Sequence, residues 1–292
     1  MTRVQTYSNP AAYAAAVDPL LAVDRARSTV ISTVLAGLLA RPYALPPMLA
    51  VAFDDDRPVA AALQTPPHPL TVLAAADSGT QDVWAGLATA VHVMGAAPQI
   101  LGGPAEDVQA FGAAWAQQSG ARIEPYDSLL LYRLREFTPP EDVPGSARRA
   151  RLVDPADPAD LDVVAQWVHD FAVFTRAVPP SAGPDPTSVR TRAARGSTTV
   201  LWIDGGRPVA MAGHSVVVGG MARIGPVFTP DVLRGRRFGS AVTAAAVDSA
   251  RKAGAAEIVL FTDADYPASN AMYRRLGFVQ IGRFADLSVV AG

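Results

Sequence analysis

A short basic segment of the chain combines residue types that could bind an anion. It joins an apolar run that predicts a strand, residues 222–228, to a helical pattern over residues 238–252. The first backbone N–H groups of a helix have no intrahelical partner and lie at the positive end of the helix dipole. Glycines allow such a loop to curl so that consecutive N–H groups converge on one anion. These features suit a pyrophosphate, with an ordinary basic loop as the alternative. The segment comprises Arg234, Gly235, Arg236, Arg237, Phe238, Gly239 and Ser240.

The strand before this loop contains Pro226. Proline has no N–H to donate to a ladder, so it occupies strand edges and bulges. Here it would interrupt pairing where the strand approaches the loop. The backbone N–H and C=O groups of Val227, Phe228 and Thr229 could then bind an extended arm of a ligand, with a simple edge strand as the alternative.

A third segment, residues 270–278, reads Asn-Ala-Met-Tyr-Arg-Arg-Leu-Gly-Phe. On a helix, Asn270 and Tyr273 are three residues apart and share a face. A tyrosine hydroxyl can donate a proton and has a reference pKa of about 10. Taken alone, however, Tyr273 is more often a packed aromatic ring than an acid.

The elements that position these segments are predicted to lie in the second of two domains. The 292 residues amount to about two domains of ordinary size. Residues 137–147, with three prolines and a glycine, predict a linker. We therefore expect domains over residues 1–136 and 148–292. A second proline-rich segment, residues 179–186, predicts a mobile loop rather than a boundary.

An internal repeat indicates that the two domains share one fold. Residues 51–64 and 201–214 both read as an apolar run, an Asp-led turn, Arg-Pro-Val-Ala and a second apolar run, which predicts a hairpin. Arg57 and Arg207 lie 150 positions apart. The elements expected in the second copy are a strand near 150–153, a helix over 159–175, a hairpin of 200–203 with 208–218, a strand over 222–228, a helix over 238–252, a strand over 257–262, a helix over 268–276 and a strand over 278–290.

Together, the three segments resemble the GCN5-related N-acetyltransferase (GNAT) family. The anion loop of that family typically reads Arg/Gln-x-x-Gly-x-Gly/Ala, and residues 234–239 fit with one departure, because Arg237 stands where the first glycine is usual. Residues 270–278 are similar to its Asn-x-x-x-Tyr-x-x-x-Gly-Phe segment, with a spacing from Asn270 to Tyr273 that is one residue shorter. The resemblance is strong over residues 150–290 and weak over 49–133. It implies an α/β (α+β) fold of two tandem GNAT-like domains, each a mixed, mainly antiparallel sheet flanked by helices.

The resemblance also implies a reaction, acetyl transfer from acetyl-CoA to an amine of a small molecule or peptide. The loop of residues 234–240 would bind the pyrophosphate, and Val227, Phe228 and Thr229 would bind the pantetheine arm. A backbone N–H near Val227 would polarise the thioester carbonyl. Tyr273 would protonate the leaving thiolate as general acid, and Asn270 would bind the cofactor arm. Because the chain has no cysteine, direct attack of the amine in a ternary complex is the simpler route.

The sequence leaves the general base and the acceptor open. His214, Asp263 and Asp265 could each remove the amine proton, directly or through water, although a structural histidine and helix-capping aspartates are the more common reading. Glu257 begins a strand and is expected to face solvent. The first copy has no basic glycine loop over residues 74–80, and Trp115 stands near the position of Tyr273, so we expect a degenerate, non-catalytic domain. The alternative function is a non-enzymatic acyl-CoA-binding regulatory module of the same fold.

Composition and missing motifs exclude other classes. The absence of cysteine excludes disulfide scaffolds, structural zinc clusters and cysteine nucleophiles, and no metal site is expected. There is neither a P-loop motif nor a Rossmann glycine motif after an early strand. With 25 Lys+Arg against 27 Asp+Glu, the chain offers no positive field for nucleic acid. The longest apolar stretch, residues 29–40, is about half the length of a membrane span. We therefore expect a cytoplasmic protein without nucleic-acid or membrane partners.

Overall fold

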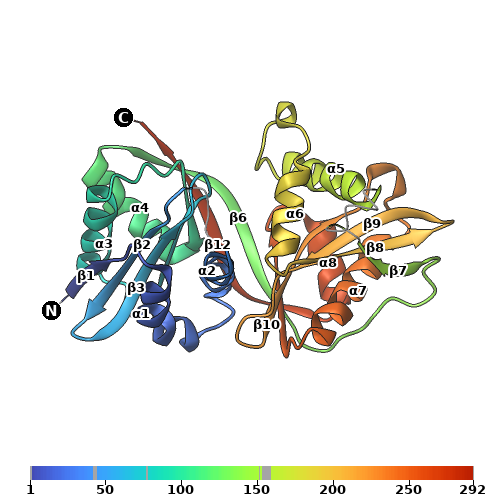
Figure 1. Ribbon diagram of the computed structural model, residues 1–292, viewed down its shortest axis with the longest axis horizontal. Helices are drawn as coiled ribbons and strands as arrows, with labels where there is room; N and C mark the ends of the chain where they lie inside the picture. Colours follow the sequence, from blue (N-terminus) through green and yellow to red (C-terminus); the bar gives the residue numbers. More distant parts are fainter. Residues whose placement is uncertain (1, 42–44, 77, 151, 153–158, 292) are drawn as a thin grey trace. The chain divides into compact units, whose positions relative to one another are not determined.

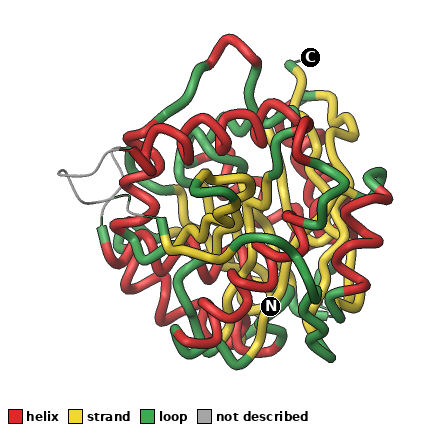
Figure 2. Tube along the Cα trace, turned by 90° about the vertical axis from the view of Figure 1, so that its right-hand side faces the viewer, coloured by secondary structure: helices red, strands yellow, loops and turns green. Residues whose placement is uncertain are grey.

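The computed structural model describes residues 2–41, 45–76, 78–150, 152 and 159–291. The chain divides into two compact units. Unit 1 comprises residues 1–131, 263–265 and 281–292, and unit 2 comprises residues 132–262 and 266–280. Figure 1 labels most elements of both units, and Figure 2 colours the alternating helices and strands along the chain.

The two halves of the sequence form the same series of elements. The first half comprises β1 (Thr2–Thr6), α1 (Pro10–Val23), α2 (Thr29–Ala40), β2 (Met48–Asp54), β3 (Arg57–Gln64), β4 (Leu70–Ala74), α3 (Gln81–Val93), β5 (Ile100–Pro104), α4 (Ala105–Ser119) and β6 (Arg122–Leu134). The second comprises β7 (Ser146–Arg149), α5 (Ala159–Phe174), α6 (Pro186–Ala194), β8 (Thr198–Asp204), β9 (Arg207–His214), β10 (Met221–Phe228), α7 (Phe238–Lys252), β11 (Glu257–Asp263), α8 (Pro267–Arg275) and β12 (Phe278–Val290). Two short 3-10 helices, Pro180–Ala182 and Asp231–Leu233, lie in the second half.

The repeated hairpins agree in register as well as in order. In β2–β3 the pair next to the turn is Asp54–Arg57, and a register shift follows Ala52. In β8–β9 the corresponding pair is Asp204–Arg207, and the shift follows Trp202. Each of these residues lies 150 positions from its counterpart, so the repeat predicted from the sequence is present in the backbone.

The sheet of each unit is mixed and mainly antiparallel. In unit 1 the order is β1-β2-β3-β4-β5 followed by β12, and β4 pairs with β5 in parallel. In unit 2 the order from the edge is β7-β8-β9-β10-β11, and β10 pairs with β11 in parallel. Parallel neighbours need a crossover, which α3 and α7 supply.

Alternation along the strands of unit 1 buries both faces of its sheet. Ala50 and Ala52 of β2 contribute to an apolar cluster with α3 and α4, whereas Leu49 and Val51 contribute to a second cluster with α1 and α2. This two-residue period explains why the strands read as continuous apolar runs. In unit 2, an apolar cluster joins α5 and α6 to Leu201 and Met211.

The observed boundaries differ from the predicted ones in three places. The first strand of the second copy is β7, which begins inside the predicted linker of residues 137–147; part of the range predicted for it, residues 151 and 153, lies outside the described residues. Residues 186–194 form α6, which the proline-rich pattern concealed. Finally, residues 281–292 group with unit 1, because β12 pairs antiparallel with β5 from Phe284–Pro104 to Ser288–Ile100. The units are therefore not the contiguous ranges 1–136 and 148–292.

Candidate active site

Strand β10 separates from β11 after its fourth residue, Ile224. The registered pairs run from Met221–Glu257 to Ile224–Leu260. On its other side, β10 pairs with β9 at Ile224 and again at Val227 and Phe228, with a register shift between them around Gly225 and Pro226. The second half of β10 thus stays attached to β9 while its opposite edge leaves β11. This is the interrupted strand that Pro226 predicted.

The predicted anion loop precedes α7 and has the backbone geometry of a curled turn. Gly235 has a φ of 79°, and a Cβ there would meet nothing within 4 Å. Arg237 is the N-cap of α7 with φ 63° and ψ 10°, in the left-handed region, and no side chain caps the helix. The first turn of α7 carries no acidic residue. Its N–H groups therefore retain the capacity to bind an anion.

The three arginines of the loop are exposed and tethered at its rim. Arg234 donates from Nε to the Thr229 carbonyl at 3.2 Å, and it pairs with Asp231 at 2.8 Å. Arg236 pairs with Asp204 at 3.2 Å, and Arg237 donates to the carbonyl of Asp142 at 3.3 Å. These contacts hold the positive charges near the start of α7 without burying them.

The structure brings the three predicted segments together at Gly239. A Cβ built on Gly239 would lie 3.4 Å from Thr229 Oγ1 and 3.4 Å from Met272 Sδ. Thr229 follows β10, and Met272 precedes Tyr273 on α8. The end of the interrupted strand, the first turn of α7 and the tyrosine helix therefore meet in unit 2.

The Tyr273 side chain is buried in unit 2. Tyr273 is 6% exposed, and its ring contacts the ring of Phe278 edge to face. Burial raises the pKa of the Tyr273 hydroxyl well above its usual value. No hydrogen bond links that hydroxyl to any residue that the structure describes. A protonated phenol without a competing partner can act as a proton donor.

Asn270 is buried within α8, where its Nδ2 donates to the Tyr266 carbonyl at 3.1 Å. This bond helps to fix the first turn of the helix that carries Tyr273. The predicted bond from Asn270 to a cofactor arm stays a prediction.

His214 has both ring nitrogens in hydrogen bonds. Nδ1 lies 2.9 Å from the Ser215 carbonyl, and Nε2 lies 3.0 Å from Ser249 Oγ on α7. A carbonyl only accepts, so Nδ1 carries the hydrogen and Nε2 accepts from Ser249. Burial, assisted by the charge of Arg149, lowers the pKa of His214, although the bond to Ser215 opposes this. This arrangement fits a structural histidine better than a general base.

Neither of the two candidate aspartates is the N-cap of α8, the position that a helix-capping role would require. Asp263 Oδ1 accepts from the Asp265 N–H at 2.7 Å in a turn, whereas the N-cap of α8 is Tyr266. Both aspartates group with unit 1. Glu257 is exposed as expected, and it pairs with Arg133 at 3.4 Å. The general base is therefore still open between Asp263, Asp265 and water.

In the first copy, the counterpart region is part of a core. Trp115 on α4 is 3% exposed and stacks on Phe111 with ring centroids 6.2 Å apart.

Elsewhere, across the described ranges, no helix is both long and apolar enough to cross a membrane. Within the same ranges, no cluster of three or more His, Asp or Glu side chains could hold a metal ion.

Sequence reasoning missed Arg223, which precedes the last β10–β11 pair. Its Nη1 is buried and makes no hydrogen bond to any described residue. Burial lowers the pKa of Arg223 to about 10. An arginine inside an apolar strand, Met-Ala-Arg-Ile, was the signal that could have identified it.

Comparison with known proteins agrees with this geometry. Residues 165–278 match the model of the acetyltransferase (GNAT) family. No curated protein sequence matches the chain significantly. Among solved structures, a tandem GNAT protein from the clavulanic acid biosynthesis pathway, determined without AcCoA, has a TM-score of 0.63 and 15% identity, covering 100% of this chain and 99% of its own.

Two further solved structures extend the likeness. A GCN5-related N-acetyltransferase from Kribbella flavida has a TM-score of 0.57 and 18% identity, covering 91% of this chain and 96% of its own. Another from Sphaerobacter thermophilus has a TM-score of 0.56 and 18% identity, covering 98% and 94%. The second half of the chain therefore carries a GNAT-family domain, and the predicted fold of two tandem GNAT-like domains is confirmed.

Proposed function

We propose that this protein transfers an acetyl group from acetyl-CoA to an amine of a small molecule or peptide, by direct attack of the amine in a ternary complex. The GNAT-family match supports acetyl transfer in general. The observation that carries the proposal is the meeting of Thr229, Gly239 and Met272, because it places an open strand edge, an uncapped helix N-terminus and the tyrosine helix at one point.

The residues of this site suit an acyl-CoA. The N–H groups of residues 238–240, together with the rim arginines, would hold the pyrophosphate. The free edge of Val227, Phe228 and Thr229 would hydrogen-bond the amide-containing arm as an added strand does. When bound, acetyl-CoA supplies an activated thioester. A backbone N–H near Val227 would polarise its carbonyl oxygen.

Tyr273 would hold the proton that the departing sulfur takes up. Its raised pKa keeps the hydroxyl protonated at neutral pH, which a donor requires. Asn270 would bind the cofactor arm in addition to fixing the helix. The attacking amine must lose a proton, and water, Asp263 or Asp265 would accept it.

The experiment is a turnover assay that follows release of free CoA thiol with a panel of small and peptide amines. We expect acetyl-CoA-dependent release that requires an amine and falls strongly in Tyr273→Phe. Tight acetyl-CoA binding with no turnover on any amine would instead identify a regulatory acyl-CoA-binding module. Absence of acetyl-CoA binding would contradict both.

A further inference from the structure

Arg223 carries a charge for which the described residues provide no counter-charge. Its Nη1 is buried and without a hydrogen-bond partner there. Burial lowers the pKa of Arg223 to about 10. The guanidinium lies over the ring of Phe261, with Cζ 6.0 Å from the ring centroid. The residue as a whole is half-buried, but a buried guanidinium nitrogen without a partner is costly, and proteins normally pair such a group.

The backbone holds Arg223 rigidly beside the point where β10 and β11 part. Its N–H donates to Ser215 Oγ at 3.0 Å, and its carbonyl accepts from the Ser215 N–H at 2.9 Å. The next residue, Ile224, forms the last pair with β11. Arg223 is therefore anchored at the closed end of the free strand edge.

Arg223 lies on the face of the sheet opposite α7. Ile224 pairs with His214, and the ring of His214 reaches Ser249 on α7. Successive side chains of a strand alternate between faces, so Arg223 points to the other face. The proposed donor phosphates bind at the start of α7, so we place the acceptor on the face of Arg223, where α5 packs against β10.

We propose that Arg223 is a specificity residue that binds an oxyanion, a carboxylate or phosphate, of the acceptor amine. The inference rests on the proposed function and names its substrate class, an amine that also carries an acidic group. A guanidinium fork matches both oxyanions in geometry and charge. Phe261 supplies an apolar surface beside it for the carbon chain that links the acid to the amine.

Matched acceptors test this proposal. The assay compares 4-aminobutanoate with 4-aminobutanamide and O-phosphoethanolamine with ethanolamine, in the wild type, Arg223→Met and Arg223→Lys. In at least one pair, we expect the wild type to favour the acidic amine over its neutral partner at least tenfold in kcat/KM. The pair that shows the larger preference identifies the oxyanion as a carboxylate or a phosphate. Arg223→Met should lose the preference with KM for acetyl-CoA unchanged, and Arg223→Lys should retain part of it.

A binding measurement separates failure of this inference from failure of the proposed function. Glutarate and inorganic phosphate serve as the ligands, and thermal unfolding detects their binding without any turnover. At least one should raise the Tm of the wild type saturably and leave that of Arg223→Met unchanged. Equal preferences in wild type and Arg223→Met, or equal probe responses, would overturn the role of Arg223 even if the enzyme is active.

A second, independent inference concerns the matching strand edge of unit 1. Leu73 pairs with Ala61, and Phe228 pairs with Met211, which lies 150 positions after Ala61. Ala74, the residue after Leu73, is therefore the counterpart of Thr229. Ala75 donates its N–H to the carbonyl of Val59 on β3. The polar groups of Ala74 consequently point the other way, toward the side of β5.

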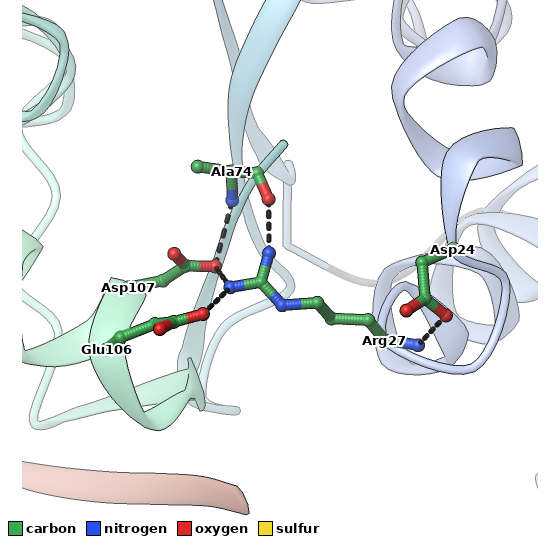
Figure 3. Close-up of polar contacts among 5 residues, drawn as sticks. All are labelled: Asp24, Arg27, Ala74, Glu106 and Asp107. Carbon is green, nitrogen blue, oxygen red and sulfur yellow. Dashed lines mark hydrogen bonds and ion pairs between the residues drawn. The ribbon is translucent and has the colours of Figure 1, made fainter. Parts of the chain in front are cut away.

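Figure 3 shows that two side chains, Asp107 and Arg27, hydrogen-bond to the N–H and C=O groups of Ala74. Asp107 Oδ2 accepts from the Ala74 N–H at 2.9 Å, and Arg27 Nη1 donates to the Ala74 carbonyl. Arg27 Nη2 also pairs with Asp107 at 2.9 Å and with Glu106 at 2.7 Å. The Asp107 side chain is only 7% exposed, so this pair fills the edge rather than lying over it.

We infer that Arg27 and Asp107 form a clamp that closes the counterpart of the acyl-donor edge, leaving one acyl-CoA site per chain. The third residue of α8 is Ser269 where that of α4 is Asp107, so unit 2 has no matching carboxylate. In addition, a Cβ on Gly103 would lie 2.4 Å from the Val72 carbonyl, which shows how closely β5 approaches this edge.

Hydrogen exchange and binding stoichiometry with CoA as the probe test the clamp. We expect one CoA per chain, slower exchange over residues 227–240 on binding and no change over residues 70–76. Two CoA per chain, or protection of residues 70–76, would overturn the inference. In the free protein, Arg27→Met/Asp107→Ala should speed exchange at the Ala74 amide at least tenfold, whereas Glu106→Gln should not. An unchanged rate would refute the clamp even if CoA fails to bind anywhere.

Discussion

The rings of Tyr273 and Phe278 meet edge to face, with centroids 6.0 Å apart and planes at 70°. This contact fixes the ring of Tyr273 independently of its hydroxyl. The packing and the chemistry of Tyr273 can therefore be tested separately.

Tyr273→Phe keeps the ring contact and removes the proposed proton donor. We expect turnover to slow about 100-fold, the lower range for loss of a general acid, with KM for acetyl-CoA unchanged. Because burial raises the pKa of Tyr273, moving from pH 8 to pH 10 should neither ionise the wild-type hydroxyl nor repair the variant. Steady-state CoA release at both pH values checks this, and full activity of Tyr273→Phe would remove Tyr273 from the mechanism. Phe278→Leu is the packing control. It should lower Tm and leave kcat close to that of the wild type.

Gly239 tests the proposed phosphate loop. A Cβ there would be in ordinary contact with Thr229 and Met272 at 3.4 Å, so Gly239→Ala should fold well. Alanine should even stabilise α7 by about 0.5–1 kcal/mol. Gly239→Leu would extend past that contact into the path of the phosphates, and we expect KM for acetyl-CoA to rise tenfold or more. KM and thermal unfolding for both variants provide the comparison; unchanged cofactor binding in Gly239→Leu would count against the loop assignment.

Local patterns in the sequence located most of the elements around this site. The helix over residues 238–252 and the strand over 278–290 have the bounds that were predicted. Helix α6 also has a local signal, since Asp185 caps it by accepting from the Ser188 N–H at 2.9 Å and Pro186 is its first residue. Proline at the first helical position is favourable, but the surrounding prolines suggested a loop.

Long-range relationships could not be predicted from local patterns. The pairing of β12 with β5 joins residues 180 to 188 positions apart, from Phe284–Pro104 to Ser288–Ile100, and no periodicity of residues 278–290 specifies which strand they join. The burial of Arg223 depends likewise on strands and helices distant in sequence. The roles of His214 and Asp263 stayed ambiguous because residue type alone does not reveal which partners already occupy their nitrogen and oxygen atoms.

Arg237 occupies a left-handed backbone conformation at the family's usual glycine position, with φ 63°. This conformation costs a non-glycine residue about 1 kcal/mol. We expect Arg237→Gly to relieve the strain, with little net change in unfolding free energy because glycine also gains freedom in the unfolded chain. KM for acetyl-CoA should rise several-fold and become less dependent on salt, because a positive charge is lost. Arg237→Lys is the control that keeps the charge, and equal salt dependence in all three proteins would contradict a phosphate contact.

His214→Gln tests the assignment of His214 as a structural residue. Glutamine already stands at the matching position 64 of the first copy. Because burial lowers the folded-state pKa of His214, the unfolded chain binds its proton more readily. The wild type should therefore lose stability as pH falls from the unfolded-state value of about 6.5 toward the lower folded value. His214→Gln should flatten this slope in denaturant titrations and keep turnover at pH 8 within about threefold of the wild type. If turnover at pH 8 instead fell about 100-fold with the fold intact, His214 would be the general base.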